Sequence, residues 1–379
     1  MLSKQYMLRA IELAKKGAGY TSPNPLVGAV IVKDDIIIGE GYHHKYGSLH
    51  AERDAINNCT VSTNGATIYV TLEPCCHYGK QPPCVDAIIE SGITRVVVGS
   101  KDPNPLVAGK GNEKLRKNGI EVIEDFMRNE CDEMNKVFFH YITKETPYVV
   151  MKYAMTIDGK IATYTGDSKW ITGDAARHNV HEDRHRYTGI MVGIGTVLAD
   201  NPMLDCRIDG KISPTRIICD TGLNTPVSSN IVNTAMKQRT IIATSVTDSS
   251  KYKPYTDKGC EVIYIPLENC SDATYDITEN KNVDLKQHLN LNVLMKELGT
   301  LKIDSILLEG GGTLNWAALR AGIVNRVQAY IAPKIIGGVT APTPVRGTGM
   351  ELMKDAITLT NSSITKIGDD YLIESDVIY

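Results

Sequence analysis

His50-Ala51-Glu52 is followed by Pro74-Cys75-Cys76 and Pro82-Pro83-Cys84, and these three stretches decide the fold. They supply one imidazole and two thiolates, which are donors that zinc prefers, and a carboxylate that need not touch the metal. A structural zinc site uses four protein ligands, whereas three ligands leave a position for a water molecule whose pKa the metal lowers. The pattern therefore predicts a catalytic zinc site with ligands His50, Cys75 and Cys84.

Glu52 is the expected proton carrier of this site. It lies two residues after His50 at a predicted strand-to-helix junction, so one side chain can hold metal while the other faces a bound molecule. A carboxylate beside an activated water can act first as base and then as acid. Two alternatives remain open, a surface His-Glu pair and a structural zinc site with Cys76 or His77 as fourth ligand.

The spacing of the cysteines matches zinc nucleobase deaminases only in part. Those enzymes combine H-x-E with P-C-x-x-C, whereas eight residues separate Cys75 from Cys84 in this chain. The longer interval predicts a loop that delivers the second thiolate and can also reach the substrate.

Composition sets broad bounds on function. The 379 residues, 42% hydrophobic, predict two domains with large cores. A formal net charge of −3 without a dense run of Lys and Arg argues against nucleic acid as a partner and favours a small molecule. With no signal-like stretch and no run of roughly 18 apolar residues, we expect no membrane partner and a cytoplasmic location. Nine dispersed cysteines favour reduced thiols over disulfides.

The first 144 residues predict a mixed sheet with helices on both faces, because strands alternate with helices after an opening hairpin. Expected strands are 26–32, 36–41, 67–72, 95–99 and 120–123. Expected helices are 3–17, one starting near His50, 84–91 and 110–118.

A domain boundary is predicted at Lys144-Glu145-Thr146-Pro147, because Pro147 stops the preceding helix and a strand begins at once. The expected domains are 1–144 and 145–379. The second domain has expected strands at 148–154, 189–194, 215–220, 240–244, 261–265, 305–308 and 326–331, and an expected helix at 291–298. Residues 245–292 are polar and predict surface loops.

Longer motifs run in order through both halves of the chain. They are 21–29 (TSPNPLVGA), 50–52 (HAE), 73–79 (EPCCHYG), 82–84 (PPC), 155–162 (MTIDGKIA), 193–202 (GIGTVLADNP) and 309–312 (EGGG). Together these motifs resemble the family of bacterial bifunctional riboflavin-biosynthesis proteins over nearly all 379 residues.

The resemblance implies an α/β fold with a cytidine-deaminase-like αβα sandwich followed by a dihydrofolate-reductase-like α/β domain. It implies zinc-dependent hydrolytic deamination of 2,5-diamino-6-ribosylamino-4-pyrimidinone 5'-phosphate, then NADPH-dependent reduction of the ribosyl chain to ribityl. The implied cofactors are one Zn²⁺ and NADPH, and we expect a homo-oligomer acting on a small phosphorylated pyrimidine.

Glu309-Gly310-Gly311-Gly312-Thr313 follows a predicted strand and opens a predicted helix, 314–321, so its backbone amides could receive a cofactor phosphate. The stretch lacks the G-x-G-x-x-G spacing, and a purely structural turn is the alternative. The resemblance implies cofactor contacts at Gly311, Gly312, Thr313, Leu314, Asn315, Trp316 and Ala317, and at Ala154, Trp170, Thr196 and Asp200.

Substrate contacts implied by the resemblance are Ser168, Arg184, Leu204, Arg207 and Glu309. Arg184 and Arg207 are suited to clamp a phosphate bidentately, with surface ion pairs as the alternative. Lys152 is a charged residue in an apolar strand, so it could donate a proton during hydride transfer or could be an edge-strand lysine.

The substrate phosphate of the deaminase needs cations or amide donors. His43, His77, Lys80 and Lys101 are candidates, and we favour His77 and Lys80 because both lie between the two zinc thiolates. Asn24, in a Pro-Asn-Pro turn, could hydrogen-bond the pyrimidine. Solvated side chains and a purely structural turn are the respective alternatives.

Two rival functions make different predictions. A tRNA or nucleobase deaminase with an accessory domain should bind nucleic acid, and a non-enzymatic zinc-stabilised module should have a fourth protein ligand.

Overall fold

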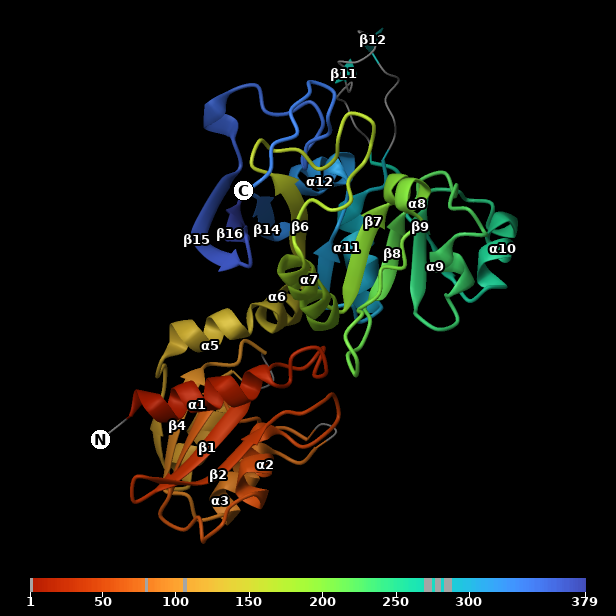
Figure 1. Cartoon of the computed structure of the whole chain (residues 1–379). Coiled ribbons are helices and arrows are strands. Elements are labelled where there is room, and N and C mark those ends of the chain that lie inside the picture. Colours follow the sequence, from red (N-terminus) through yellow and green to blue (C-terminus); the bar gives the residue numbers. More distant parts are fainter. Residues whose placement is uncertain (1–2, 79–80, 105–107, 269–274, 277–280, 283–287) are drawn as a thin grey trace. The chain divides into compact units, whose positions relative to one another are not determined.

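A computed structural model describes residues 3–78, 81–104, 108–268, 275–276, 281–282 and 288–379. The chain divides into two compact units, Met1–Glu145 and Thr146–Tyr379 (Figure 1). Each unit is built around its own sheet.

The first unit contains a five-stranded sheet of order β2-β1-β3-β4-β5. Its strands are β1 (Gly28–Lys33), β2 (Ile36–Tyr42), β3 (Thr67–Leu72), β4 (Arg95–Ser100) and β5 (Glu121–Ile123). β1 is antiparallel to β2 and β3, whereas β3, β4 and β5 run parallel. Because parallel neighbours end at one edge, the residues after β3 and β4 come together there.

Helices cover both faces of this sheet. They are α1 (Lys4–Lys15), α2 (Ala51–Asn57), α3 (Cys84–Glu90), α4 (Lys110–Lys117), α5 (Arg128–Met134) and α6 (Lys136–Lys144). Successive residues of β1 point to opposite faces, so Val30 packs in one core with Met7 of α1 and Cys131 of α5. Ile31 packs in the other core with Ala55 of α2. The unit is an αβα sandwich.

The second unit contains a nine-stranded sheet of order β10-β9-β8-β7-β13-β6-β14-β16-β15. Its strands are β6 (Tyr148–Thr156), β7 (Gly189–Gly193), β8 (Thr215–Cys219), β9 (Thr240–Thr244), β10 (Glu261–Tyr264), β13 (Ser305–Leu308), β14 (Val324–Ala332), β15 (Thr358–Ile367) and β16 (Asp370–Ile378). The strands from β10 to β14 are parallel, and β16 and β15 add an antiparallel hairpin. A separate short ribbon pairs β11 (Tyr275–Asp276) with β12 (Lys281–Asn282).

Helices also cover both faces of the larger sheet. They are α7 (Asp174–Arg186), α8 (Ile194–Asp200), α9 (Asn230–Asn233), α10 (Lys253–Thr256), α11 (Leu291–Thr300) and α12 (Gly312–Arg320), with short 3-10 turns at Ser249–Tyr252 and Met353–Asp355. Met191 of β7 packs in one core with Leu294 of α11. Its neighbour Ile190 packs in the opposite core with Val197 of α8 and Ile231 of α9.

The structure corrects several sequence expectations. β7 ends at Gly193, and Ile194 already belongs to α8. The glycine stretch enters its helix at Gly312 rather than at Leu314. β6 pairs on both sides, with β13 and β14, so Lys152 is not an edge-strand lysine.

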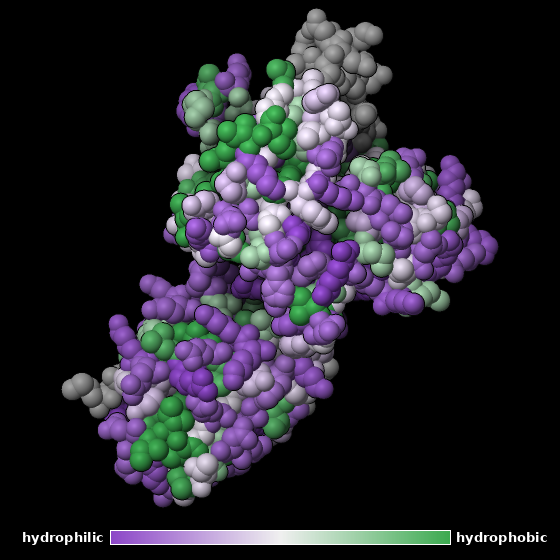
Figure 2. All heavy atoms as spheres, viewed as in Figure 1, coloured by the Kyte–Doolittle hydropathy of each residue, from purple (hydrophilic) through white to green (hydrophobic). Residues whose placement is uncertain are grey.

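No helix among the described residues is both long and apolar enough to cross a bilayer. On the face drawn in Figure 2, hydrophilic side chains cover much of each unit, with hydrophobic side chains in patches between them.

Candidate active sites

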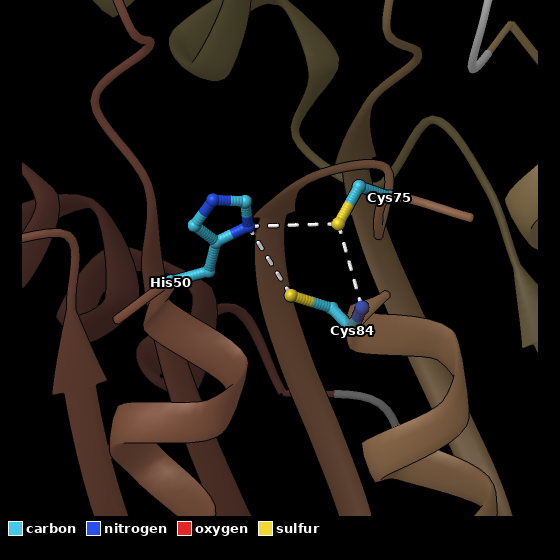
Figure 3. Close-up of side chains that lie close together, drawn as sticks. All are labelled: His50, Cys75 and Cys84. Atoms are coloured by element: carbon cyan, nitrogen blue, oxygen red, sulfur yellow. Dashed lines mark hydrogen bonds between the residues drawn. The ribbon is translucent and has the colours of Figure 1, made fainter. Parts of the chain in front are cut away.

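His50, Cys75 and Cys84 come together at one edge of the smaller sheet (Figure 3). Nδ1 of His50 lies 3.5 Å from Sγ of Cys75 and 3.3 Å from Sγ of Cys84. The three potential ligand atoms all lie within 4.8 Å of one another, and neither Cys76 nor His77 joins this group among the described residues. The geometry therefore favours three protein ligands over the four of a structural site.

Each ligand is fixed by the start of a helix or the end of a strand. His50 is the N-cap of α2, Cys84 is the first residue of α3, and Cys75 follows β3. Arg53 of α2 joins these parts, because its guanidinium donates to the carbonyl oxygens of Pro82 (3.2 Å) and Pro83 (2.8 Å), immediately before Cys84.

A close approach between β2 and α2 sets the depth of the site. A Cβ atom on Gly41 of β2 would lie 2.2 Å from the backbone nitrogen of Ala55 and 2.6 Å from the carbonyl oxygen of Ala51. Only glycine allows α2, which carries Glu52, to pack this closely.

The two sulfurs differ, because the hydrogen bond with Cys75 and burial raise the pKa of the Cys84 thiol, whereas the pKa of Cys75 is lowered. Hydrogen bonding from Cys84 and from the nearby His50 lowers the pKa of the Cys75 thiol to about 4, against the opposing effect of burial. A thiolate is the metal-binding form of cysteine. Burial raises the pKa of Glu52, and the charge of Cys75 raises it further.

A cavity of about 320 Å³ opens beside the cluster. His50, Glu52 and Cys75 line it, together with Asn24 and His77. Nδ1 of His77 is buried without a hydrogen-bond partner among the described residues, so it can bind a polar group of a molecule in the cavity.

Asn24 is oriented by His43. Nδ1 of His43 is 2.9 Å from the carbonyl oxygen of Leu49, so this nitrogen carries the proton and donates. Nε2 must then accept from Nδ2 of Asn24, at 3.2 Å. The amide oxygen of Asn24 is left as an acceptor in the cavity wall, and His43, buried and engaged through both ring nitrogens, offers no donor to a phosphate.

The other phosphate candidates have different positions. Lys80 lies outside the described residues. Lys101 does not line the cavity beside the cysteines, but a second cavity with Arg128, His140 and Lys144.

Charged side chains in the second unit gather around Glu309. Nε and Nη2 of Arg184 donate to Oε1 and Oε2 of Glu309 at 2.8 and 3.0 Å, and Nη1 donates to the carbonyl oxygen of Asp205 at 3.1 Å. Nζ of Lys152 lies 3.9 Å from Oε2 of Glu309. Burial alone would raise the pKa of Glu309, but the charges of Arg184 and Lys152 outweigh it and lower the pKa to about 2.

The two arginines of the expected phosphate clamp are in different surroundings. Arg184 is not paired at the surface, since its side chain is 15% exposed, and all three of its guanidinium nitrogens already have acceptors. Arg207 is 58% exposed and donates through Nε to Asp205 at 3.0 Å, so it remains the arginine that is available to a phosphate.

A larger cavity of about 540 Å³ lies in the same unit. The predicted cofactor residues that line it are Thr196, Asp200, Gly311, Gly312, Thr313, Leu314 and Ala317. Thr196 and Asp200 belong to α8, and the others run from Gly311, the N-cap of α12, to Ala317 within that helix.

Four predicted cofactor residues do not line this cavity. Ala154 packs on the core beneath α7. Trp170 is 61% exposed, and the Arg177 guanidinium lies 4.5 Å from its ring centroid. Asn315 is fully buried, and its Nδ2 donates to the carbonyl oxygen of Pro344 at 2.8 Å. Trp316 packs against Gly347, where a Cβ atom would lie 2.1 Å from its indole.

Ser168 and Leu204 are the two remaining residues predicted to contact substrate. Ser168 is half-buried. Leu204 buries its side chain in the core beneath α8 and α9, and its carbonyl oxygen accepts from Nε2 of Gln238 at 3.0 Å. Contacts from Ser168 and Leu204 to substrate stay predictions.

Comparison with known proteins identifies both units. The cytidine and deoxycytidylate deaminase zinc-binding region matches residues 2–100, and the RibD C-terminal domain matches residues 147–373. The riboflavin biosynthesis protein RibD of Actinobacillus pleuropneumoniae is 51% identical over 378 residues, covering 100% of this chain and 96% of that protein. The chain belongs to the RibD family of riboflavin biosynthesis proteins.

Two further relatives agree over nearly the full length. RibD of Bacillus amyloliquefaciens is 42% identical, covering 97% of this chain and 95% of its own. A crystal structure from Thermotoga maritima, of a diaminohydroxyphosphoribosylaminopyrimidine deaminase/5-amino-6-(5-phosphoribosylamino)uracil reductase, has 38% identity and a TM-score of 0.83, with 99% and 98% of the two chains covered.

Family membership confirms the expected fold class and activity. The first unit is cytidine-deaminase-like and the second is a dihydrofolate-reductase-like RibD C-terminal domain. The chain is a bifunctional deaminase and reductase of riboflavin biosynthesis that uses zinc and NADPH and acts on small phosphorylated pyrimidines.

Sequence reasoning missed some residues that line the cavities. Asp102 and Asn104 lie beside the zinc cluster because they follow β4, the parallel neighbour of β3. The rule that parallel strands end at one edge could have found both. Thr221 and Arg346 line the larger cavity, and no local pattern in the sequence marks Arg346.

Proposed function

We propose that residues 1–144 carry the deaminase with His50, Cys75 and Cys84 as zinc ligands and Glu52 as the proton carrier. The observation that carries this proposal is the cluster of one imidazole and two sulfurs beside a cavity that Glu52 also lines. When bound, zinc supplies a water molecule of lowered pKa as the nucleophile. The donor set fits this ion, because two thiolates and an imidazole favour zinc among the common divalent metals.

Glu52 takes a proton from the water nucleophile and returns it to the departing amine. Its burial supports this role, because a carboxyl group with a raised pKa can hold a proton between the two transfers. The amide oxygen of Asn24 accepts from an amine of the pyrimidine, and His77 binds a second polar group. Lys80 stays a prediction for the phosphate.

Residues 145–379 carry the reductase. NADPH supplies the hydride, and the glycines at the start of α12 and the start of α8 form its binding cavity. Gly312 lines this cavity and also lets the neighbouring loop pack on α12, because a Cβ atom there would lie 2.5 Å from Cγ of Arg346 and 2.8 Å from the carbonyl oxygen of Thr343. Arg207 binds the substrate phosphate. The Arg184–Glu309 pair positions Lys152, whose lowered pKa, caused by burial, favours proton donation near C1'.

The alternative of a tRNA or nucleobase deaminase has less support, because the comparisons favour the riboflavin enzymes over both units. The absence of a nucleic-acid or membrane partner, the homo-oligomeric state and the cytoplasmic location stay predictions.

An assay of the full-length chain with the diaminopyrimidine ribosyl phosphate tests the proposal if ammonia release and NADPH oxidation are followed separately. Cys84→Ser should lose bound zinc, measured by metal analysis, and ammonia release, yet still oxidise NADPH when given the deaminated intermediate. Arg207→Ala should release ammonia normally and raise the KM for that intermediate. Full zinc content in Cys84→Ser, or an unchanged KM in Arg207→Ala, would contradict the corresponding assignment.

A further inference from the structure

We propose that Arg346 binds the pyrophosphate of NADPH beside the first turn of α12. This inference rests on the proposed cofactor site of the second unit and adds a residue that none of the predicted contact stretches contains. It follows from the position of Arg346, the state of its guanidinium and the charge of the cavity.

Arg346 is held against the start of α12 by its backbone and its side-chain stem. Its backbone nitrogen donates to the carbonyl oxygen of Gly312 at 3.0 Å. A Cβ atom on Gly312 would lie 2.5 Å from Cγ and 2.9 Å from Cδ of Arg346, so the stem crosses directly over this glycine. These contacts hold Arg346 at the wall of the 540 Å³ cavity, which it lines.

The loop that carries Arg346 is fixed to the same helix. Nδ2 of the buried Asn315 donates to the carbonyl oxygen of Pro344 at 2.8 Å, and the Thr343 hydroxyl donates to the carbonyl oxygen of Val345 at 2.9 Å. The first bond ties the loop to α12, and the second holds the turn of the loop itself. Asn315 therefore helps to position the loop that carries Arg346.

The guanidinium of Arg346 has no protein partner among the described residues. It makes neither an ion pair nor a side-chain hydrogen bond there, and Arg346 is exposed while it also lines the cavity. By contrast, each guanidinium nitrogen of Arg184 in the same unit donates to Glu309 or Asp205. Arg346 is therefore available to a bound anion.

The cavity needs a cation if it is to hold a phosphorylated molecule. Among the described residues that line it, Arg346 is the one Lys or Arg, and Asp200 is the one carboxylate. The first turn of α12 adds free backbone N–H groups, which attract phosphate oxygens at short range. A guanidinium next to such a turn can share a pyrophosphate with it, since it donates two parallel hydrogen bonds to phosphate oxygens.

The position also distinguishes the pyrophosphate from the 2'-phosphate of NADPH. The stem of Arg346 lies on Gly312 itself, so the guanidinium and the helix N–H groups act on the same phosphate. A pyrophosphate joins the two nucleosides of NADPH and NADH and is also present at the 5' end of ADP, whereas among these three only NADPH carries a 2'-phosphate. Arg346 should therefore contribute to the binding of NADPH, NADH and ADP.

The test uses the full-length chain and isothermal titration calorimetry, so that it does not depend on turnover. Arg346→Met removes the charge and keeps an apolar stem over Gly312, and Arg346→Lys restores a charge without the planar fork. Lys237→Met is the matched control, because it also removes one positive charge from an exposed position in this unit and does not line the cavity. Thermal melting checks that each variant is folded.

We expect Arg346→Met to bind NADPH and ADP about tenfold more weakly, with partial recovery in Arg346→Lys and no change in Lys237→Met. Affinity for adenosine 2'-monophosphate, which lacks a pyrophosphate, should not change. Equal affinities of wild type and Arg346→Met for ADP would overturn the proposal, as would a loss confined to adenosine 2'-monophosphate and NADPH. A wild-type chain that binds neither NADPH nor ADP would instead overturn the proposed cofactor site.

Discussion

Glu52 is a buried carboxyl group that nevertheless reaches a cavity. It is 3% exposed, yet it lines the cavity beside the zinc ligands and carries a raised pKa. A metal ligand would be held in its charged form, whereas a proton carrier must change its charge. We therefore expect Glu52 to act on protons without holding the metal.

Glu52→Gln tests this separation of roles. Ammonia release should fall by about a hundredfold to ten-thousandfold, the usual range for loss of a general acid-base group. Zinc content should stay at the wild-type level. Glu90→Gln, at an exposed position of α3, is the control for the loss of one carboxylate from the first unit. Metal loss in Glu52→Gln would show instead that Glu52 supports the zinc ligands.

Arg184 and Glu309 form a buried pair in which each charge depends on the other. Arg184→Met leaves the Glu309 carboxylate with Lys152 alone at 3.9 Å, and breaking a buried pair in this way costs about 3–5 kcal/mol of unfolding free energy at neutral pH. The double variant with Glu309→Gln should recover part of that loss. Chemical denaturation of the four chains measures both effects.

The pH dependence of this pair has a definite sign. In the wild type the pKa of Glu309 falls from its ordinary 4.5 to about 2, so its stabilising contribution is complete above pH 4.5 and is lost as the pH falls towards 2. In Arg184→Met burial is no longer offset by the arginine, and the pKa of Glu309 rises. The variant should then gain stability relative to wild type as the pH is lowered from 7. A constant difference between the two chains from pH 7 to 4 would contradict this coupling.

At the scale of elements, Asp158 joins the loop that follows β6 to the loop that follows β14. Its Oδ2 accepts from the backbone nitrogen of Gly337 at 2.7 Å, and both oxygens lie 3.3 Å from the backbone nitrogen of Ile336. Nearby, the backbone nitrogen of Ile161 donates to the carbonyl oxygen of Pro342 at 2.9 Å, and both residues line the cavity.

Asp158→Asn should loosen this connection, because an amide presents only one acceptor to the two backbone donors. We expect several-fold weaker NADPH binding and faster hydrogen exchange at Ile336 and Gly337, with ammonia release unchanged. Asp369→Asn, exposed in the turn between β15 and β16, is the matched control. Wild-type exchange rates in Asp158→Asn would mean that other contacts hold the loop.

Elements that carry a local signal were predictable from the sequence. β3, β9 and β13 match their expected ranges, because a short apolar run between turn residues is typical of a buried strand. β15 was missed, because it is exposed along most of its length and its sequence, TLTNSSITKI, lacks a continuous apolar face. Its pairing with β16 decides its conformation, and that information is not local.

The same distinction separates the two sites. His50 and Cys84 were predictable as neighbours, because each lies at the start of a helix in a recognisable motif. The engaged state of Arg184 could not be foreseen, because its partner Glu309 lies 125 residues further along the chain. Arg346 likewise reaches the cavity through contacts with Gly312, on another element and with no motif of its own.

At the scale of the whole molecule, the two activities lie in units with separate hydrophobic cores. One core includes Ala51 and Val85, which is next to Cys84, and contains residues of the first unit alone. The core around Leu294 contains residues of the second unit alone. A ligand that binds one folded unit stabilises that unit and need not change the other.

Zinc removal should therefore act on one unit. With chelator, ammonia release should stop and the unfolding transition of the first unit should move to lower temperature, because His50, Cys75 and Cys84 then lose the interaction that stabilises their shared position. NADPH oxidation with supplied deaminated intermediate should be unchanged, and NADPH should raise only the second transition. Differential scanning calorimetry with each ligand added or withdrawn measures both unfolding transitions. The Cys84→Ser variant assigns them, because its first transition should no longer respond to zinc. A single transition that responds to both ligands would mean that the two units unfold together despite their separate cores.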